Sequence, residues 1–123
     1  MQAEETRTGA IALVETEDGY RNIAEICATP ELAPLMIGSF DLSVSMGYAG
    51  DWRQPVVRTA VKEMVRSGTA AGLPVIMPVF APDPAECRAL IDHWRGEGVT
   101  TFVIGSDKII IAETFAQWTA ALS

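Results

Sequence analysis

Apolar residues in this chain form short runs that alternate with longer stretches of helical periodicity. The runs span residues 10–14, 35–38, 75–77 and 101–104. Each is rich in large or β-branched apolar residues, which is typical of strands. Consecutive apolar positions, as in residues 10–14, indicate a strand buried on both faces. A strand followed by a helix, four times over, predicts an α/β fold with a parallel sheet.

The stretches after these runs carry apolar residues every three or four positions, as an amphipathic helix does. Gly72 ends the second stretch, while Asp83, Pro84 and Glu86 start the third as N-cap, N1 and N3 residues. The first stretch predicts one short helix that stops before Pro30. We expect these stripes to be buried against the sheet, and they comprise Tyr20, Ile23, Ala24, Cys27, Val57, Val61, Met64, Val65, Gly68, Cys87, Leu90, Ile91, Trp94, Ile111, Phe115, Trp118 and Leu122.

The length limits the architecture. With 123 residues and no linker or low-complexity tract, residues 1–123 form a single domain. A complete (β/α)8 barrel takes roughly 250 residues, so four strand–helix units amount to half of one. An open, doubly wound domain of flavodoxin type is the structural alternative, although it usually has five strands.

The charge and hydropathy of the chain indicate which kinds of partner it does not bind. The chain has 9 Lys and Arg against 16 Asp and Glu, a net charge of −7, which disfavours nucleic acid and anionic membranes. Residues 1–7 lack the basic start and apolar run of a signal peptide, and the longest apolar stretch, 73–81, is too short to span a bilayer. We therefore expect a cytoplasmic protein with neither a nucleic-acid nor a membrane partner.

Few side chains suit covalent catalysis. Cys27 and Cys87 fall on apolar stripes, where a free cysteine behaves as a small hydrophobe. His93, the only histidine, is expected on a helix surface. Lys62 lies in mid-helix and Lys108 begins the last helix, so neither is suited to form a Schiff base.

Candidate chemistry gathers where the strands end, because ligands of parallel α/β folds bind outside the carboxyl ends of the strands. Glu15 follows the first run, and the segment 39–41, ending in Asp41, follows the second. Neighbouring strands are about 4.8 Å apart, so both carboxylates can reach one point. Two such carboxylates repel each other unless a cation or a proton lies between them, and Mg²⁺ or Mn²⁺ suits this oxygen set. The alternative is that each carboxylate caps or braces its own loop.

The residues around these carboxylates carry a family resemblance. Val14-Glu15-Thr16, followed by Gly-Ser-Phe-Asp-Leu-Ser-Val-Ser-Met-Gly at 38–47, resembles the "(I/V)ET" and "GPxDLSxSxG" motifs of the HpcH/HpaI aldolase/citrate lyase family. Ser39 and Phe40 stand where that family usually has Pro and Ala. The resemblance extends in order through all four units and implies half of a (β/α)8 TIM barrel of the phosphoenolpyruvate/pyruvate superfamily, namely its C-terminal half.

The resemblance also implies an activity and a site. Glu15 and Asp41 would be ligands of Mg²⁺ or Mn²⁺, and the backbone N–H groups of Phe40 and Asp41 would bind the carboxylate of pyruvate. Ser39 belongs to the same substrate-binding segment, and Met77 would contribute to an apolar wall for the aldehyde part. The implied function is a class II, metal-dependent aldolase (lyase) that cleaves 4-hydroxy-2-oxo acids to pyruvate and an aldehyde.

The family's catalytic His and Arg have no counterpart in this chain. It can therefore be a fragment, a half that pairs with another copy or with a separate N-terminal half, or a non-catalytic half-barrel that binds metal or keto acid. An acyl-CoA lyase of the citrate lyase beta type is a further alternative. The resemblance implies a homo-oligomer assembled through C-terminal helices, and the stripe from Ile111 to Leu122 would serve that role or cover its own sheet.

Overall fold

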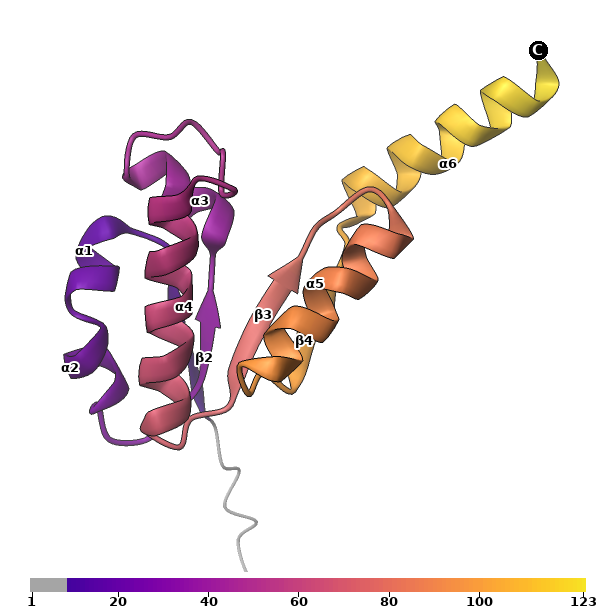
Figure 1. The fold of residues 1–123 in the computed structure, drawn as a ribbon. Coiled ribbons are helices and arrows are strands. Elements are labelled where there is room, and N and C mark those ends of the chain that lie inside the picture. Colours follow the sequence, from indigo (N-terminus) through magenta and orange to yellow (C-terminus); the bar gives the residue numbers. More distant parts are fainter. Residues whose placement is uncertain (1–8) are drawn as a thin grey trace, which may run out of the picture.

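Four parallel strands form one sheet in the order β1-β2-β3-β4, in a computed structural model that describes residues 9–123 (Figure 1). They are β1 (Ala10–Val14), β2 (Leu32–Ile37), β3 (Val75–Val79) and β4 (Thr101–Ile104). Every neighbouring pair is parallel. The predicted α/β fold with a parallel sheet is confirmed.

Helices follow each strand, with two departures from the prediction. They are α1 (Glu17–Arg21), α2 (Ile23–Cys27), α3 (Ser39–Ser45), α4 (Pro55–Ala70), α5 (Pro84–Gly96) and α6 (Asp107–Leu122). The single helix expected over 20–27 is broken at Asn22, whose side chain donates a hydrogen bond to the carbonyl oxygen of Asp18. The segment expected to be a loop after β2 begins with α3, because burying Leu42 completely favours a helical turn there.

The core lies between one face of the sheet and the helices. Val14, Leu35, Ile37, Val75, Met77 and Val79 point to this side and are at most 4% exposed. Helix α4 supplies the opposing surface through the predicted stripe, and Val57, Val61, Met64 and Val65 are all buried. The buried residues alternate along the strands and recur every three or four positions on α4, so the strand pattern and the helix pattern of the sequence form one core.

The other face of the sheet is open. Ile11 is 57% and Leu13 is 50% exposed, and Val103 on β4 is exposed as well. The prediction that the first strand is buried on both faces is therefore wrong for this chain by itself. Half of a barrel has this property, because the face that would line the barrel interior has no opposing strands.

Strands β2 and β3 separate toward their carboxyl ends (Figure 1). Their paired residues are Leu35 with Val75 and Met36 with Ile76. Proline explains why the pairing does not continue. Alternate residues of a parallel strand bond to opposite neighbours, and the carbonyl of Pro74 bonds to β2 while that of Val79 bonds toward β4. Position 78 thus faces β2, and Pro78 has no N–H to donate there.

Helix α6 projects away from the rest of the molecule (Figure 1). Its residues Ile111, Phe115, Trp118 and Leu122 are between 54% and 86% exposed. The expectation that this stripe covers its own sheet is wrong, because the helix leaves the sheet immediately after Ser106 caps its first turn. Within residues 9–123, no helix is long and apolar enough to cross a membrane.

Candidate functional site

Glu15 lies where β1 gives way to α1. Thr16, and not Glu15, caps that helix, since its side-chain oxygen accepts a hydrogen bond of 3.0 Å from the backbone N–H of Gly19. The Glu15 side chain instead lies across the end of β2. A Cβ placed on Gly38 would lie 2.7 Å from Glu15 Cβ and 3.0 Å from Glu15 Oε2. Because Gly38 has no side chain, the Glu15 carboxylate can lie against the backbone at this position.

Asp41 lies in the first turn of α3, which begins immediately after Gly38. Gly38 is the N-cap of α3 and offers no side-chain hydrogen bond, and the first bond within the helix runs from Leu42 N–H to the Gly38 carbonyl, at 2.9 Å. The N–H groups of Ser39, Phe40 and Asp41 precede that bond and have no partner inside the helix. One short segment thus carries free backbone donors and the exposed Asp41 carboxylate, and it begins at Gly38, against which Glu15 lies.

The donor set suits a hard divalent cation. Neither Glu15 nor Asp41 takes part in an ion pair within the described part of the chain. Neither residue is a helix N-cap, which is the alternative role that its position suggested. Across residues 9–123, no group of three or more His, Cys, Asp or Glu side chains is arranged to hold a metal. Mg²⁺ typically uses one or two protein carboxylates and completes its shell with water and substrate oxygens, so two carboxylates fit it.

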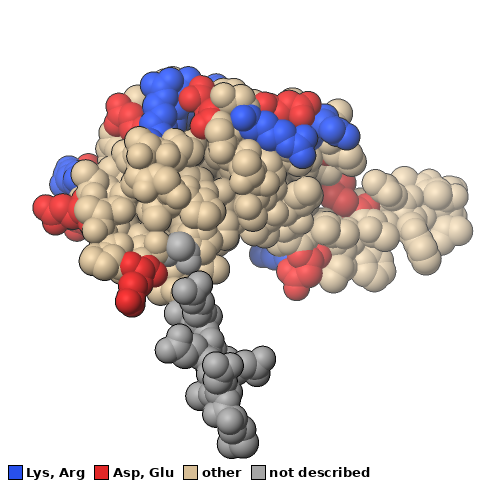
Figure 2. Space-filling model, turned by 90° about the horizontal axis from the view of Figure 1, so that it is seen from below, with Lys and Arg blue, Asp and Glu red and all other residues tan. Residues whose placement is uncertain are grey.

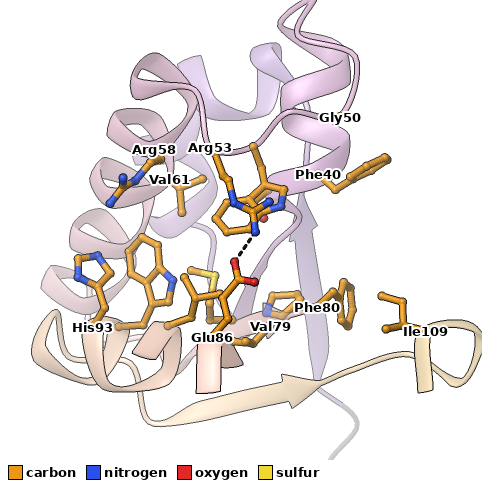
Figure 3. Close-up of a pocket in the computed structure, with 16 residues that line it drawn as sticks. Phe40, Gly50, Arg53, Arg58, Val61, Val79, Phe80, Glu86, His93 and Ile109 are labelled. Atoms are coloured by element: carbon orange, nitrogen blue, oxygen red, sulfur yellow. Dashed lines mark hydrogen bonds and ion pairs between the residues drawn. The ribbon is translucent and has the colours of Figure 1, made fainter. Parts of the chain in front are cut away.

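A cavity of about 600 Å³ opens beside this segment, between the diverging ends of β2 and β3 and between α4 and α5 (Figure 3). Three residues predicted to bind substrate line it, namely Ser39, Phe40 and Met77. Glu15 and Asp41 are not among the lining residues. The residues predicted to form one site are therefore divided between the carboxyl ends of β1 and β2, where Glu15 and Asp41 lie, and an adjoining cavity.

Several cavity residues carry no local signal in the sequence. Arg53 forms an ion pair with Glu86 across the cavity, and its guanidinium lies 4.3 Å from the centre of the Trp52 ring (Figure 3). Arg58 and His93 lie at one end of the cavity. Glu86 was read only as the N3 residue of a helix, and no local pattern could pair it with an arginine 33 positions earlier.

The cysteines stay apart from this site. Cys27 is buried and Cys87 is half-buried, both as free thiols, and neither lines the cavity. Burial raises the pKa of the Cys27 thiol. A protonated thiol is a poor nucleophile, which fits the expected role of Cys27 as a small apolar side chain.

The parallel strands, the helices that follow them and the carboxylates at the strand ends define part of a (β/α) barrel. Residues 1–111 match the HpcH/HpaI aldolase/citrate lyase family. The chain belongs to this family, as the two sequence motifs predicted.

Relatives and solved structures agree with this assignment. A 5-keto-4-deoxy-D-glucarate aldolase of Escherichia coli O6:H1 is 29% identical, over 85% of this chain and 41% of the relative. An HpcH/HpaI aldolase/citrate lyase family protein from Burkholderia cenocepacia J2315 has a TM-score of 0.80 at 28% identity, over 94% of this chain and 42% of that one. The citrate synthase SbnG has a TM-score of 0.80 at 25% identity, over 92% and 44%. The chain thus spans about two fifths of the length of these proteins.

Proposed function

We propose that this chain is the C-terminal half-barrel of a divalent-metal-dependent aldolase that cleaves 4-hydroxy-2-oxo acids to pyruvate and an aldehyde. The observation that carries the proposal is the meeting of Glu15 with the first turn of α3 at Gly38. In this proposal the Glu15 and Asp41 carboxylates would serve a cation and the backbone donors of α3 would serve an anion, and pyruvate requires both kinds of partner. Residues 1–123 would form the single domain that holds this half of the barrel.

Each residue has a defined role in this proposal. Glu15 and Asp41 would hold Mg²⁺ or Mn²⁺, and the backbone N–H groups of Phe40 and Asp41 would bind the pyruvate carboxylate. The ion would act as a Lewis acid on the keto oxygen and so assist carbon–carbon bond cleavage. Ser39, Phe40 and Met77 would border the aldehyde part, because they line the cavity next to the segment. No lysine is needed as a covalent catalyst.

The rest of the reaction site would come from outside this chain. The family's acid–base His and its carboxylate-binding Arg have no counterpart here, and the chain spans about two fifths of its relatives. The exposed apolar residues of the inner sheet face and of α6 support association with an N-terminal half or with further copies of the chain. A keto acid would be its small-molecule partner.

Two measurements test the proposal. Mn²⁺ binding, followed by electron paramagnetic resonance, is expected to weaken at least about tenfold in Glu15→Gln and in Asp41→Asn, since each loses a charged ligand. Asp107→Asn, which alters an exposed aspartate in the first turn of α6, is the matched control and should bind as the parent does. Equal Mn²⁺ affinity in all four proteins would contradict the assignment of the ligands.

The second measurement addresses catalysis. Exchange of the pyruvate methyl protons for deuterium, followed by NMR, is expected to depend on added Mg²⁺ and to disappear in Glu15→Gln. A folded, metal-loaded chain that shows no exchange would exclude turnover by this chain alone. That result would favour the alternative of a half-barrel that binds metal and keto acid without catalysis.

A further inference from the structure

The far end of the cavity is built around Arg58. A second cavity, of about 300 Å³, adjoins the first, and the two share Arg58, His93 and Trp94. Arg58 is in the first turns of α4, and His93 and Trp94 are near the end of α5. The shared residues therefore stand where the groove between these two helices opens to solvent.

Arg58 is a basic side chain of this groove that has no ion-pair partner among the described residues. The other basic groups beside it are neutralised, since Arg53 pairs with Glu86 and Lys62 Nζ lies 2.6 Å from Glu97 Oε1. Arg58 forms no ion pair within residues 9–123. The chain as a whole carries a net charge of −7, so a free guanidinium at a cavity opening stands out from its surroundings. Charged side chains gather along one edge of the molecule in Figure 2, with basic and acidic groups interspersed.

The walls beyond Arg58 are mostly apolar, apart from Ser39 and the Arg53–Glu86 ion pair. Val61, Met77 and Val79 are buried side chains of the cavity wall, and Leu90 and Trp94 are half-buried. In Figure 3, Arg58 and His93 lie at one end, and Phe40, Phe80 and Ile109 lie at the other. A volume of about 600 Å³ with mostly apolar walls and few polar groups is the usual construction of a small-molecule site.

We propose that this cavity binds a small organic anion, whose oxyanion pairs with Arg58 and whose apolar body lies against Leu90 and Trp94. A planar guanidinium donates two parallel hydrogen bonds to a carboxylate or a phosphate, and these are stronger than bonds between neutral groups. The inference does not depend on the proposed metal ligands, because neither Glu15 nor Asp41 lines the cavity, although this cavity is also the one proposed to border the aldehyde part. It assigns a role to Arg58, a residue that no motif of the sequence singled out.

The test uses metal-free protein and three probes of matched shape: phenylacetate, phenyl phosphate and the neutral phenylacetamide. Binding is read from tryptophan fluorescence, since Trp52 and Trp94 both line the cavity. Both anions are expected to bind more tightly than phenylacetamide, and the ratio of their affinities shows whether the site prefers a carboxylate or a phosphate. Arg58→Gln is expected to lose about tenfold or more in affinity for the anions and little for the amide. Arg58→Lys keeps the positive charge but loses the paired donors of the guanidinium, so it should retain part of the affinity for the anions.

Arg66→Gln is the matched control, because Arg66 lies two turns further along α4, pairs with Glu97 and lines neither cavity. Its affinity for the anions is expected to equal that of the parent. The inference is overturned if phenylacetamide binds as tightly as phenylacetate, if Arg66→Gln and Arg58→Gln lose equal affinity, or if no anion binds at millimolar concentration. Arg58 is exposed, so its substitution should leave the circular dichroism spectrum unchanged.

Discussion

Gly38 decides where the Glu15 carboxylate lies, although Gly38 itself carries no chemistry. Its backbone φ of −90° suits any residue, so the requirement for glycine comes from space alone. The carboxylate of Glu15 occupies part of the volume that any larger side chain would need. A glycine in this position is part of the candidate site as much as the acidic residue it accommodates.

Gly38→Ala tests this arrangement. The added methyl group would meet Glu15 Cβ at 2.7 Å, and overpacking of this kind costs about 1–3 kcal/mol. We expect a lower urea midpoint and weaker Mn²⁺ binding. Gly96→Ala is the control, because a Cβ there meets nothing within 4 Å at the end of α5, and alanine favours a helix. A Gly38→Ala protein as stable as the parent would contradict the close approach.

Glu97 gives a pH dependence with a defined sign. The hydrogen bond from Lys62, and then the charges of Lys62 and Arg66, lower the pKa of Glu97 below its ordinary 4.5. A carboxylate with a lowered folded-state pKa stabilises the protein above its unfolded-state pKa, and this contribution is lost as the pH falls below 4.5 toward the folded-state value.

Glu97→Gln should therefore reduce the urea midpoint at pH 7, and reduce it less at pH 3, where part of the charge contribution is lost. Glu113→Gln, on the exposed surface of α6, should change neither value. A Glu97→Gln protein that loses the same stability at both pH values would show that the charge of Glu97 is not what stabilises the contact between α4 and the end of α5.

The positions of single residues could be predicted only where the signal is local. Glu15 and Asp41 follow their strands directly in the sequence, so their place at the carboxyl end of the sheet could be read from the chain. Arg58, Arg53 and Glu86 meet at the cavity only because α4 and α5 lie on either side of the opening between β2 and β3. That geometry depends on tertiary packing and leaves no periodic signal.

Among the helices, α5 was predicted well because its start has a local cause. Asp83 accepts a 2.9 Å hydrogen bond from the N–H of Glu86, and Pro84 occupies the first turn, where its missing N–H costs nothing. Helix α3 was missed because it is short and depends on the burial of Leu42. Helix α6 was predicted as a helix but misplaced, since periodicity indicates an apolar stripe and does not show what covers it.

The N-cap of α5 supports a quantitative prediction. Replacing Asp83 by alanine leaves the N–H of Glu86 without its partner, and such caps contribute about 0.5–2 kcal/mol. The free energy of unfolding, measured in urea, should fall by about that amount. Asp92→Ala on the exposed side of the same helix should cost less, because its contact with Arg95 spans 3.7 Å between exposed side chains. Equal losses would argue against the cap.

At the scale of the whole molecule, the sheet has one buried face and one open face. Val14, Leu35 and Ile37 contribute to the core on the helical side, while Ile11 and Leu13 stay half exposed on the other. The sequence could not distinguish these faces, because both are apolar. It could predict the exposed inner face only through the comparison of chain length with that of a complete barrel.

Substituting one leucine on each face of the sheet tests the difference in burial between the two faces. Leu35→Ala removes a fully buried side chain and should cost about 2–5 kcal/mol, through lost burial and a new cavity. Leu13→Ala, at a position that is 50% exposed, should cost under about 1 kcal/mol in the chain alone. Urea unfolding of both variants gives the comparison. Similar losses would mean that the inner face is covered in solution.

Pro78 keeps the carboxyl ends of β2 and β3 apart beside the cavity, through the backbone N–H that it lacks. Any other amino acid at this position would restore an amide donor facing the Ile37 carbonyl, and the two central strands could then close by another hydrogen-bonded step. The width of the cavity thus depends on the backbone at this position, whereas the proposed affinity for a ligand depends on other side chains. A substitution at Pro78 would therefore change the width of the cavity, whereas a substitution at Arg58 would change only the charge at its opening.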